Sequence, residues 1–191
     1  MIGPREPFGI DADGWVVGVR RIDSPNADER TAGEQVSLIV VHAISLPPAE
    51  FGSDAILELF TNCLDPTQHP YFQTISALRV SSHFLIRRDG QAIQFVACQR
   101  RAWHAGVSSW NGHDRCNDFS IGIELEGCDE RPFEDAQYRQ LVALIETLRT
   151  HYPITSLAGH SDIAPGRKTD PGPCFEWQRL SGFARSMSLP H

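Results

Sequence analysis

The chain has 191 residues, 41% of them hydrophobic, and carries a formal net charge of −7. This length suits one globular domain with a buried core, and the acidic balance argues against nucleic acid as a main partner. No apolar run approaches the ~20 residues of a membrane span, and the first residues, MIGPREPFGIDADGW, lack the basic cluster and apolar segment of a signal peptide, so we expect a cytoplasmic protein without membrane contact.

The first part of the chain predicts an arm, a buried strand and a short helix. Residues 1–33 mix Pro, Gly, Asp and Arg around one strand candidate at 15–20 (WVVGVR), and we expect them to wrap around the rest. Residues 36–41 (VSLIVV) are a continuous apolar run, typical of a strand buried on both faces, and His42 stands at its carboxyl end. Ser53 can cap a short helix that follows.

The middle of the chain predicts a hairpin and a second strand. Two strand-like runs flank Asp89-Gly90, which is a strong signal for a tight hairpin turn, and an irregular surface loop should follow. Residues 119–127 (FSIGIELEG) then alternate strictly between apolar side chains and small or polar ones. Glu124 therefore lies on the sparsely filled face of that strand, together with Gly122.

Helical spacing of apolar residues predicts a long helix over 134–151, and a terminal helix is expected near 175–185. Strands interleaved with helices indicate an α/β or α+β sheet protein. We therefore predict a single domain over residues 1–191, with residues 34–180 as its core.

The segment 159–173 (GHSDIAPGRKTDPGP) combines titratable side chains with many prolines and glycines, which predict a bent, rigid loop without regular helix or strand. Catalytic zinc takes three protein ligands from His, Asp, Glu or Cys and leaves one position open for water. His42, together with His160 and Asp170 in this loop, offers such a set if the loop folds back over the sheet. From the pattern alone, packed or surface histidines are the alternative.

Glu124 and Lys168 are the candidates for chemistry beside such a metal. A metal-bound water needs a carboxylate within hydrogen-bond reach, and Gly122 clears space beside Glu124. Lys168 stands two residues before Asp170, where its ammonium group could stabilise the oxyanion of a tetrahedral intermediate. The alternatives are a solvated strand glutamate and a solvated surface lysine.

Other chemistries lack their sequence marks. The chain has no G-x-S-x-G elbow, no P-loop and no G-x-G-x-x-G after a strand, which disfavours serine hydrolases and nucleotide-binding proteins. Its five cysteines are irregularly spaced and include no C-x-x-C pair, so they fit a reducing compartment. No cysteine has a neighbouring histidine that would mark it as a nucleophile. Metal-assisted hydrolysis is the best chemical interpretation.

Five motifs occur together in the chain: VVHAISLPP, LRVSSHFLIRRDGQAIQFV, RAWHAG, FSIGIELEG and GHSDIAPGRKTDPGP. With these motifs in this order, from about Trp15 to Trp177, the chain resembles the AmpD family, the cytoplasmic zinc amidases of bacterial cell-wall recycling. The resemblance implies a central mixed β-sheet flanked by helices, the fold of the wider N-acetylmuramoyl-L-alanine amidase and peptidoglycan-recognition group.

The resemblance also implies a reaction and a set of roles. The reaction is hydrolysis of the amide between the lactyl group of 1,6-anhydro-N-acetylmuramic acid and L-alanine of the stem peptide. By resemblance, the zinc ligands fall on His42, His160 and Asp170, the general base or acid on Glu124, and the oxyanion-stabilising lysine on Lys168.

Substrate-binding residues are expected around these positions. Arg79 resembles the family's substrate-carboxylate arginine, and a guanidinium can hold a carboxylate through two hydrogen bonds. Trp103 and His104 are expected to line the groove, with a core role as the alternative for Trp103, whereas His83 is expected to be structural. The family usually has asparagine where this chain has Ala43, so substrate affinity or anhydro-sugar selectivity should differ while zinc binding survives.

Two other functions stay open at this point. An amidase that prefers intact peptidoglycan is disfavoured by the absent signal peptide. A non-catalytic muropeptide sensor should have lost a metal ligand or the base, yet all of these residue types are present. We expect a monomer whose partner is the anhydromuropeptide substrate.

Overall fold

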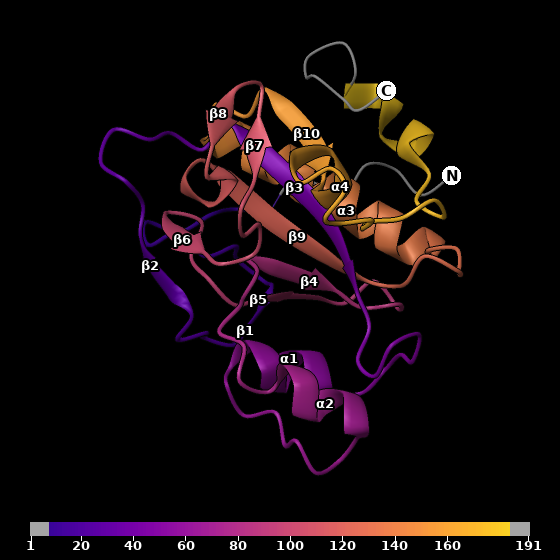
Figure 1. Cartoon of the computed structure of the whole chain (residues 1–191). Helices are drawn as coiled ribbons and strands as arrows, with labels where there is room; N and C mark the ends of the chain where they lie inside the picture. Colours follow the sequence, from indigo (N-terminus) through magenta and orange to yellow (C-terminus); the bar gives the residue numbers. More distant parts are fainter. Residues whose placement is uncertain (1–7, 184–191) are drawn as a thin grey trace.

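The computed structural model describes residues 8–183, whose helices and strands are layered around one sheet (Figure 1). Six strands form this sheet in the order β1-β5-β4-β9-β3-β10. They span Arg20–Arg21 (β1), Leu38–Ile44 (β3), Phe84–Ile86 (β4), Ala92–Gln94 (β5), Ser120–Glu126 (β9) and Ser156–Gly159 (β10). β4 and β5 are antiparallel and the other neighbouring pairs are parallel, so the sheet is mixed, as predicted.

Two short antiparallel ribbons lie outside this sheet. One pairs β2 (Ala27–Glu29) with β6 (Arg100–Ala102), and the other pairs β7 (Ser109–Trp110) with β8 (His113–Asp114). The helices are α1 (Ala55–Phe60), α2 (Pro70–Ile75), α3 (Asp135–His151) and α4 (His160–Ile163), with 3-10 helices at Cys116–Asp118 and Trp177–Phe183. Within residues 8–183, no helix has the length and apolar character needed to cross a membrane.

The predicted elements with strong local signals are confirmed. The apolar run at 36–41 enters β3, which continues past His42 to Ile44, and the alternating run at 119–127 contains β9. The hairpin of β4 and β5 turns at Gly90, whose φ of +87° suits glycine. The long helix is α3, which begins with a reciprocal capping box between Glu134 and Gln137.

Three predictions about local structure need correction. The strand expected at 15–20 is wrong, because the chain turns at Gly18 with a φ of +84° and only Arg20 enters β1. The segment 159–173 is not wholly irregular, since it begins at the end of β10 and continues into the one-turn helix α4. The terminal helix near 175–185 is a 3-10 helix that ends at Phe183, and the remainder of that range lies outside the described residues.

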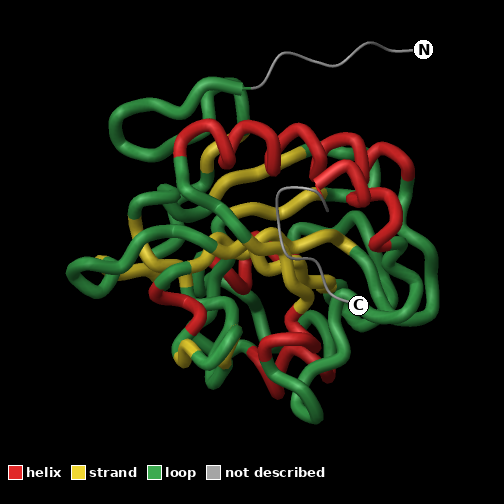
Figure 2. Tube along the Cα trace, turned by 90° about the horizontal axis from the view of Figure 1, so that it is seen from above, coloured by secondary structure: helices red, strands yellow, loops and turns green. Residues whose placement is uncertain are grey.

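The two faces of the sheet have different coverings. Helix α3 lies across one face (Figure 2), where it packs against odd-numbered residues of β3 and β9 such as Ile39 and Ile121. In these two strands the even-numbered residues point to the opposite face, as the alternation of a strand requires. His42 on β3 and Glu124 on β9 are register partners on this second face.

Two apolar clusters border this polar pair on the second face. In one cluster, Ile56 and Phe60 of α1 pack with Leu85 of β4. In the other, Val40 of β3 packs with Ile163 of α4. The sheet therefore presents its polar residues in a gap between two packed regions, where side chains from different elements can converge.

Arg30 ties the N-terminal arm to the loops beside the sheet. Its guanidinium donates hydrogen bonds of 2.9–3.1 Å to the carbonyl oxygens of Cys98, Asn117, Asp118 and Ser120. Burial lowers the pKa of Arg30 to about 10, so the side chain is still charged at neutral pH. One cation thus satisfies four backbone acceptors from segments that are distant in sequence.

We expect Arg30→Met to lower the free energy of unfolding by about 3 kcal/mol or more, because each buried acceptor left without a donor costs about 1–3 kcal/mol. Urea unfolding measures the change. The matched control is Arg20→Met, an exposed arginine in the same arm, which should change stability by no more than about 0.5 kcal/mol. An Arg30→Met protein as stable as the parent would contradict the anchoring role.

Candidate metal centre

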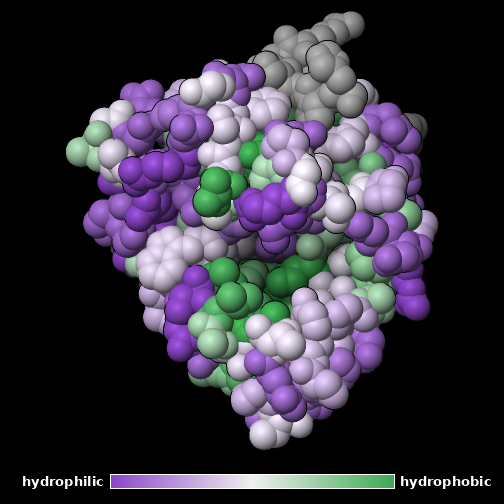
Figure 3. Space-filling model, viewed as in Figure 1, coloured by the Kyte–Doolittle hydropathy of each residue, from purple (hydrophilic) through white to green (hydrophobic). Residues whose placement is uncertain are grey.

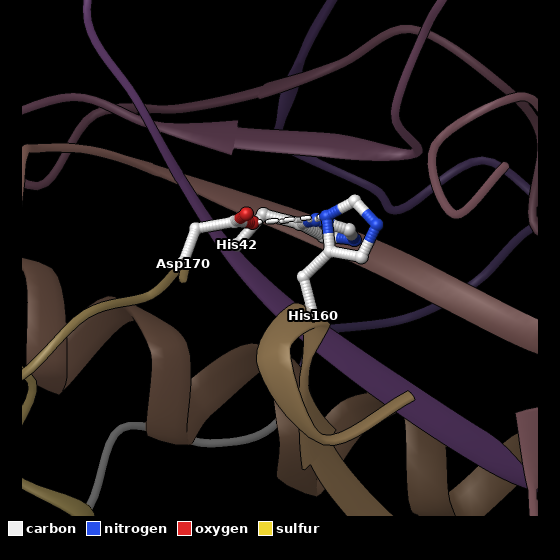
Figure 4. Close-up of side chains that lie close together, drawn as sticks. All are labelled: His42, His160 and Asp170. Carbon is white, nitrogen blue, oxygen red and sulfur yellow. Dashed lines mark hydrogen bonds and ion pairs between the residues drawn. The ribbon is translucent and has the colours of Figure 1, made fainter. Parts of the chain in front are cut away.

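Three side chains from separate elements point toward one another on the second face of the sheet (Figure 4). His42 comes from β3, His160 from the start of α4, and Asp170 from the loop that follows. The two Nδ1 atoms are 3.0 Å apart, and each lies 3.1 Å from Oδ2 of Asp170. The sequence prediction that these three residues converge is therefore confirmed.

Backbone pairing explains why residues so far apart in sequence meet. β10 pairs in parallel with β3, and Gly159 is the register partner of Val41, so His160 begins α4 beside His42. The loop then returns, and the amide of Ser161 donates a 2.8 Å hydrogen bond to the carbonyl oxygen of Asp170. This closure places the Asp170 side chain against both histidines.

The chemistry of these three groups suits a cation. Burial lowers the pKa of His42 to about 4, so its ring is neutral at pH 7. Burial by itself would raise the pKa of Asp170, but the two histidine rings beside its carboxylate outweigh burial and hold that pKa well below the usual range. Two imidazoles and a carboxylate are a typical set of metal ligands. The described residues contain one such group of three, and it is this one.

Glu124 lies beside the cluster as the register partner of His42. Its side chain is buried, and Oε2 finds no hydrogen-bond partner among the described residues. Burial, and next the charge of Asp170, raise the pKa of Glu124 well above its usual value, while Lys168 acts in the opposite direction. A buried carboxylate oxygen without a partner is costly, which suggests that it serves a ligand.

Glu126 shows how a structural glutamate on the same face differs. Its Oε1 accepts a 2.6 Å hydrogen bond from the amide of Gly52, and its Oε2 accepts one of 3.2 Å from the amide of Arg88. Both oxygens are thus used to hold loops against the sheet. The contrast singles out Glu124 as the carboxylate that is available for chemistry.

A groove with a volume of about 500 Å³ opens over the cluster. In Figure 3 the groove is visible as a hollow in this face of the molecule, with hydrophobic residues at its floor. Apolar side chains that line it are Leu46, Leu59, Phe60, Leu78 and Val80. The groove therefore joins a polar centre to an apolar wall, as expected for a site that binds a small molecule.

The other predicted site residues occupy different positions around this groove. Trp103, His104 and Lys168 all line it, and so does Ala43. Arg79 is exposed, and its Nη1 donates hydrogen bonds of 3.4 and 3.1 Å to the carbonyl oxygens of Ser76 and Leu78. The roles of these residues in binding and catalysis stay predictions.

His83 has the structural role that its place in the sequence predicts. The ring is buried, its Nδ1 accepts a 3.0 Å hydrogen bond from the amide of Gly122, and its Nε2 donates one of 3.0 Å to the carbonyl oxygen of Arg100. Burial, followed by the nearby charge of Arg30, lowers the pKa of His83 to about 3. This ring is thus a neutral link between two strands and a loop.

Sequence reasoning missed the groups that contact the outer nitrogens of His42 and His160. Nε2 of His42 lies 2.9 Å from Nδ1 of His104, and Nε2 of His160 lies 3.1 Å from the carbonyl oxygen of Ala105. A backbone carbonyl leaves no mark in the sequence. Gly122 was a partial signal, since the space that it clears is filled by the ring of His104.

Comparisons with known proteins show the family of this chain. The family profile described as N-acetylmuramoyl-L-alanine amidase matches residues 32–173. The 1,6-anhydro-N-acetylmuramyl-L-alanine amidase AmpD of Citrobacter freundii is 57% identical over 178 residues, which are 92% of this chain and 95% of that protein.

Solved structures confirm the predicted fold. A crystal structure of an AmpD derivative has a TM-score of 0.86 at 54% identity, covering 94% of this chain and 99% of that one. The E. coli amidase AmiD in complex with anhydro-N-acetylmuramic acid-L-Ala-D-gamma-Glu-L-Lys has a TM-score of 0.60 at 29% identity, covering 95% of this chain and 67% of that one. This chain belongs to the N-acetylmuramoyl-L-alanine amidase family and, within that family, to the AmpD group.

Proposed function

We propose that this protein is a zinc-dependent amidase that hydrolyses the bond between 1,6-anhydro-N-acetylmuramic acid and L-alanine of the stem peptide during peptidoglycan recycling in the cytoplasm. The observation that carries the proposal is the convergence of His42, His160 and Asp170 beside the unpartnered oxygen of Glu124. Identity of 57% to a protein named for this activity supports the choice of substrate.

Zinc fits the three ligand atoms. It binds histidine nitrogen and aspartate oxygen at about 2.0–2.2 Å in a tetrahedral arrangement, which separates two ligand atoms by roughly 3.3 Å. The atoms of His42, His160 and Asp170 lie 3.0–3.1 Å apart. His42, His160 and Asp170 would hold the zinc and leave a fourth position open; the metal would lower the pKa of a water there toward neutral and would itself polarise the amide carbonyl.

Glu124 is the residue that moves the proton in this proposal. Its Oε2 has no hydrogen-bond partner among the described residues, and Glu124 lines the groove on the strand next to that of His42. Oε2 accepts a proton from the attacking water and delivers it to the amide nitrogen as the C–N bond breaks. The proton lost by the water is thus the proton that the leaving amine gains.

Other groove residues would bind and stabilise the substrate. Lys168 lines the groove, and its ammonium group would stabilise the negative charge that develops on the carbonyl oxygen. Trp103 offers an aromatic surface to the substrate, and the neighbouring apolar wall excludes water from it. Arg79, which follows the groove residue Leu78, is the candidate for the stem-peptide carboxylate.

The proposal is tested by incubating the zinc-loaded protein with anhydromuramyl-tripeptide and identifying the products by mass spectrometry. We expect release of anhydro-N-acetylmuramic acid and a peptide with a free L-alanine amine, and we expect a strong chelator to stop it. Zinc-loaded protein that leaves the substrate intact would contradict the proposal.

The same assay separates the two alternatives. Faster release of peptide from intact sacculi than from anhydromuramyl-tripeptide would favour an amidase of the intact wall. Saturable binding of the tripeptide without turnover would favour a sensor. The expected monomer is checked separately by light scattering.

A further inference from the structure

One short segment, His104 and Ala105, contacts both histidine ligands at Nε2, the ring nitrogen on the side away from the cluster. This segment follows β6 closely in the chain. Nδ1 of His104 lies 2.9 Å from Nε2 of His42, and the carbonyl oxygen of Ala105 lies 3.1 Å from Nε2 of His160. Two adjacent residues, one through its ring and one through its backbone, therefore meet the outer nitrogens of two ligands that are 118 positions apart.

The hydrogen-bond partners fix the proton of His160 and are compatible with one matching tautomer of His104. A carbonyl oxygen only accepts, so Nε2 of His160 carries hydrogen and its Nδ1 presents a lone pair to the cluster. Nε2 of His104 lies 3.2 Å from the hydroxyl of Ser120, and a proton on that nitrogen leaves Nδ1 of His104 as the acceptor for His42. Both ligands then present Nδ1 lone pairs in the same direction, as a metal requires.

The segment is held from two sides. Oδ1 of Asn117 accepts hydrogen bonds from the backbone amides of His104, at 3.2 Å, and Ala105, at 2.8 Å. On the other side, the ring of His104 lies against β9 at Gly122, where an added Cβ would come within 2.5 Å of the ring. Glycine at this position is therefore a space requirement, and the ring occupies that space.

We propose that His104 and Ala105, clamped by Asn117 and seated on Gly122, are the outer shell that fixes the ring orientation and tautomer of both histidine ligands. His104 is then a positioning residue, and its side chain acts on the metal through His42. Three residues on one face of β9 contribute to this centre. Oγ of Ser120 lies 3.2 Å from Nε2 of His104, Gly122 leaves room for that ring, and Glu124 is the register partner of His42. This inference rests on the metal site of the proposed function.

Zinc affinity tests the inference, measured on the full chain by competition with a chromophoric chelator. His104→Phe keeps the ring size but removes the acceptor, so we expect zinc to bind about 10- to 100-fold more weakly. His104→Gln restores an acceptor for His42 and should recover most of the affinity. The visible absorption of the cobalt-loaded protein should change in the phenylalanine variant and return toward the parent spectrum in the glutamine variant.

Control measurements separate positioning from simple loss of structure. His113→Phe replaces a ring that stacks on Phe119, outside this network, and should leave zinc affinity unchanged. Thermal unfolding of the metal-free variants records folding. If His104→Phe does not fold, Asn117→Ala and Gly122→Ala decide the question in the same zinc assay. Asn117→Ala removes the acceptor that holds the backbone of the segment, Gly122→Ala displaces the ring of His104, and neither alters a ligand.

The outcomes distinguish this inference from the proposed function. Parent protein that binds no zinc would refute the metal site itself. Parent protein that binds zinc while folded His104→Phe, Asn117→Ala and Gly122→Ala variants bind it equally tightly would refute only the outer shell. Weaker zinc binding by a folded variant, together with rescue by His104→Gln, would support it.

Discussion

The Glu124→Gln variant is expected to bind zinc as the parent protein does and to hydrolyse the amide about 10²- to 10⁴-fold more slowly. Glutamine has nearly the same shape as glutamate, but its amide cannot take a proton from water and pass it to the leaving amine. Single-turnover rates on anhydromuramyl-tripeptide measure the effect at the chemical step. Metal content by mass spectrometry shows whether the site is still loaded.

Glu126→Gln is the matched control for this experiment. Glu126 lies on the same face of β9 and is buried, but its oxygens accept hydrogen bonds from the amides of Gly52 and Arg88. We expect this variant to lose stability, because an NH₂ group replaces one acceptor, and to keep its turnover rate. A Glu124→Gln protein with parental turnover would remove Glu124 from the mechanism.

Removing a ligand should have the largest effect. We expect Asp170→Ala to lose zinc during purification and to show no hydrolysis above background. The carboxylate supplies the negative charge of the ligand set, and without it only two imidazole rings remain. Since an outer-shell partner alone is worth about 10- to 100-fold in metal affinity, loss of a direct ligand should exceed that range. Zinc content and turnover, measured on the same preparation, check both expectations.

Asp162→Ala is the control for this substitution. Asp162 lies in α4, within the same segment, but its Oδ2 accepts a 2.6 Å hydrogen bond from the amide of Gly159. The substitution should weaken the start of α4, because a capping contact is worth about 1 kcal/mol, and the variant protein should still retain zinc. Full zinc content and turnover in Asp170→Ala would show that the aspartate is not a ligand.

Some features of this protein could be predicted from local sequence. The alternation along β9 assigned Glu124 to the face opposite the apolar residues, and the Asp-Gly turn placed the hairpin of β4 and β5. The spacing of apolar residues placed α3. Each of these signals is local, because the period of a strand or helix is set by its own backbone geometry.

Other elements could not be predicted because their cause is not local. β10 has four residues and no periodicity, and it is a strand because Ser156–Gly159 pair with β3 across a long stretch of chain. The expected strand at 15–20 failed for a related reason. Its valines suit a strand, but Gly18 turns the chain before the segment reaches the sheet edge at β5.

The sequence by itself determined which chemical groups are present and which side of a strand each one occupies. It also carried the family motifs, which predict His42, His160 and Asp170 as metal ligands, and the structure brings these three side chains together. The tertiary structure alone decided which buried groups touch one another. Glu124 and Glu126 look the same in the pattern, yet only Glu124 has a buried oxygen without a partner.

The same limit explains why the surroundings of the two histidine ligands were missed. His42 and His104 are 62 positions apart, and His160 and Ala105 are 55 apart. Such contacts depend on strand order and loop closure, and periodicity describes only the direction in which a side chain leaves its own backbone. Direction follows from local geometry, whereas contact requires that two distant segments be brought together by the packing of the whole sheet.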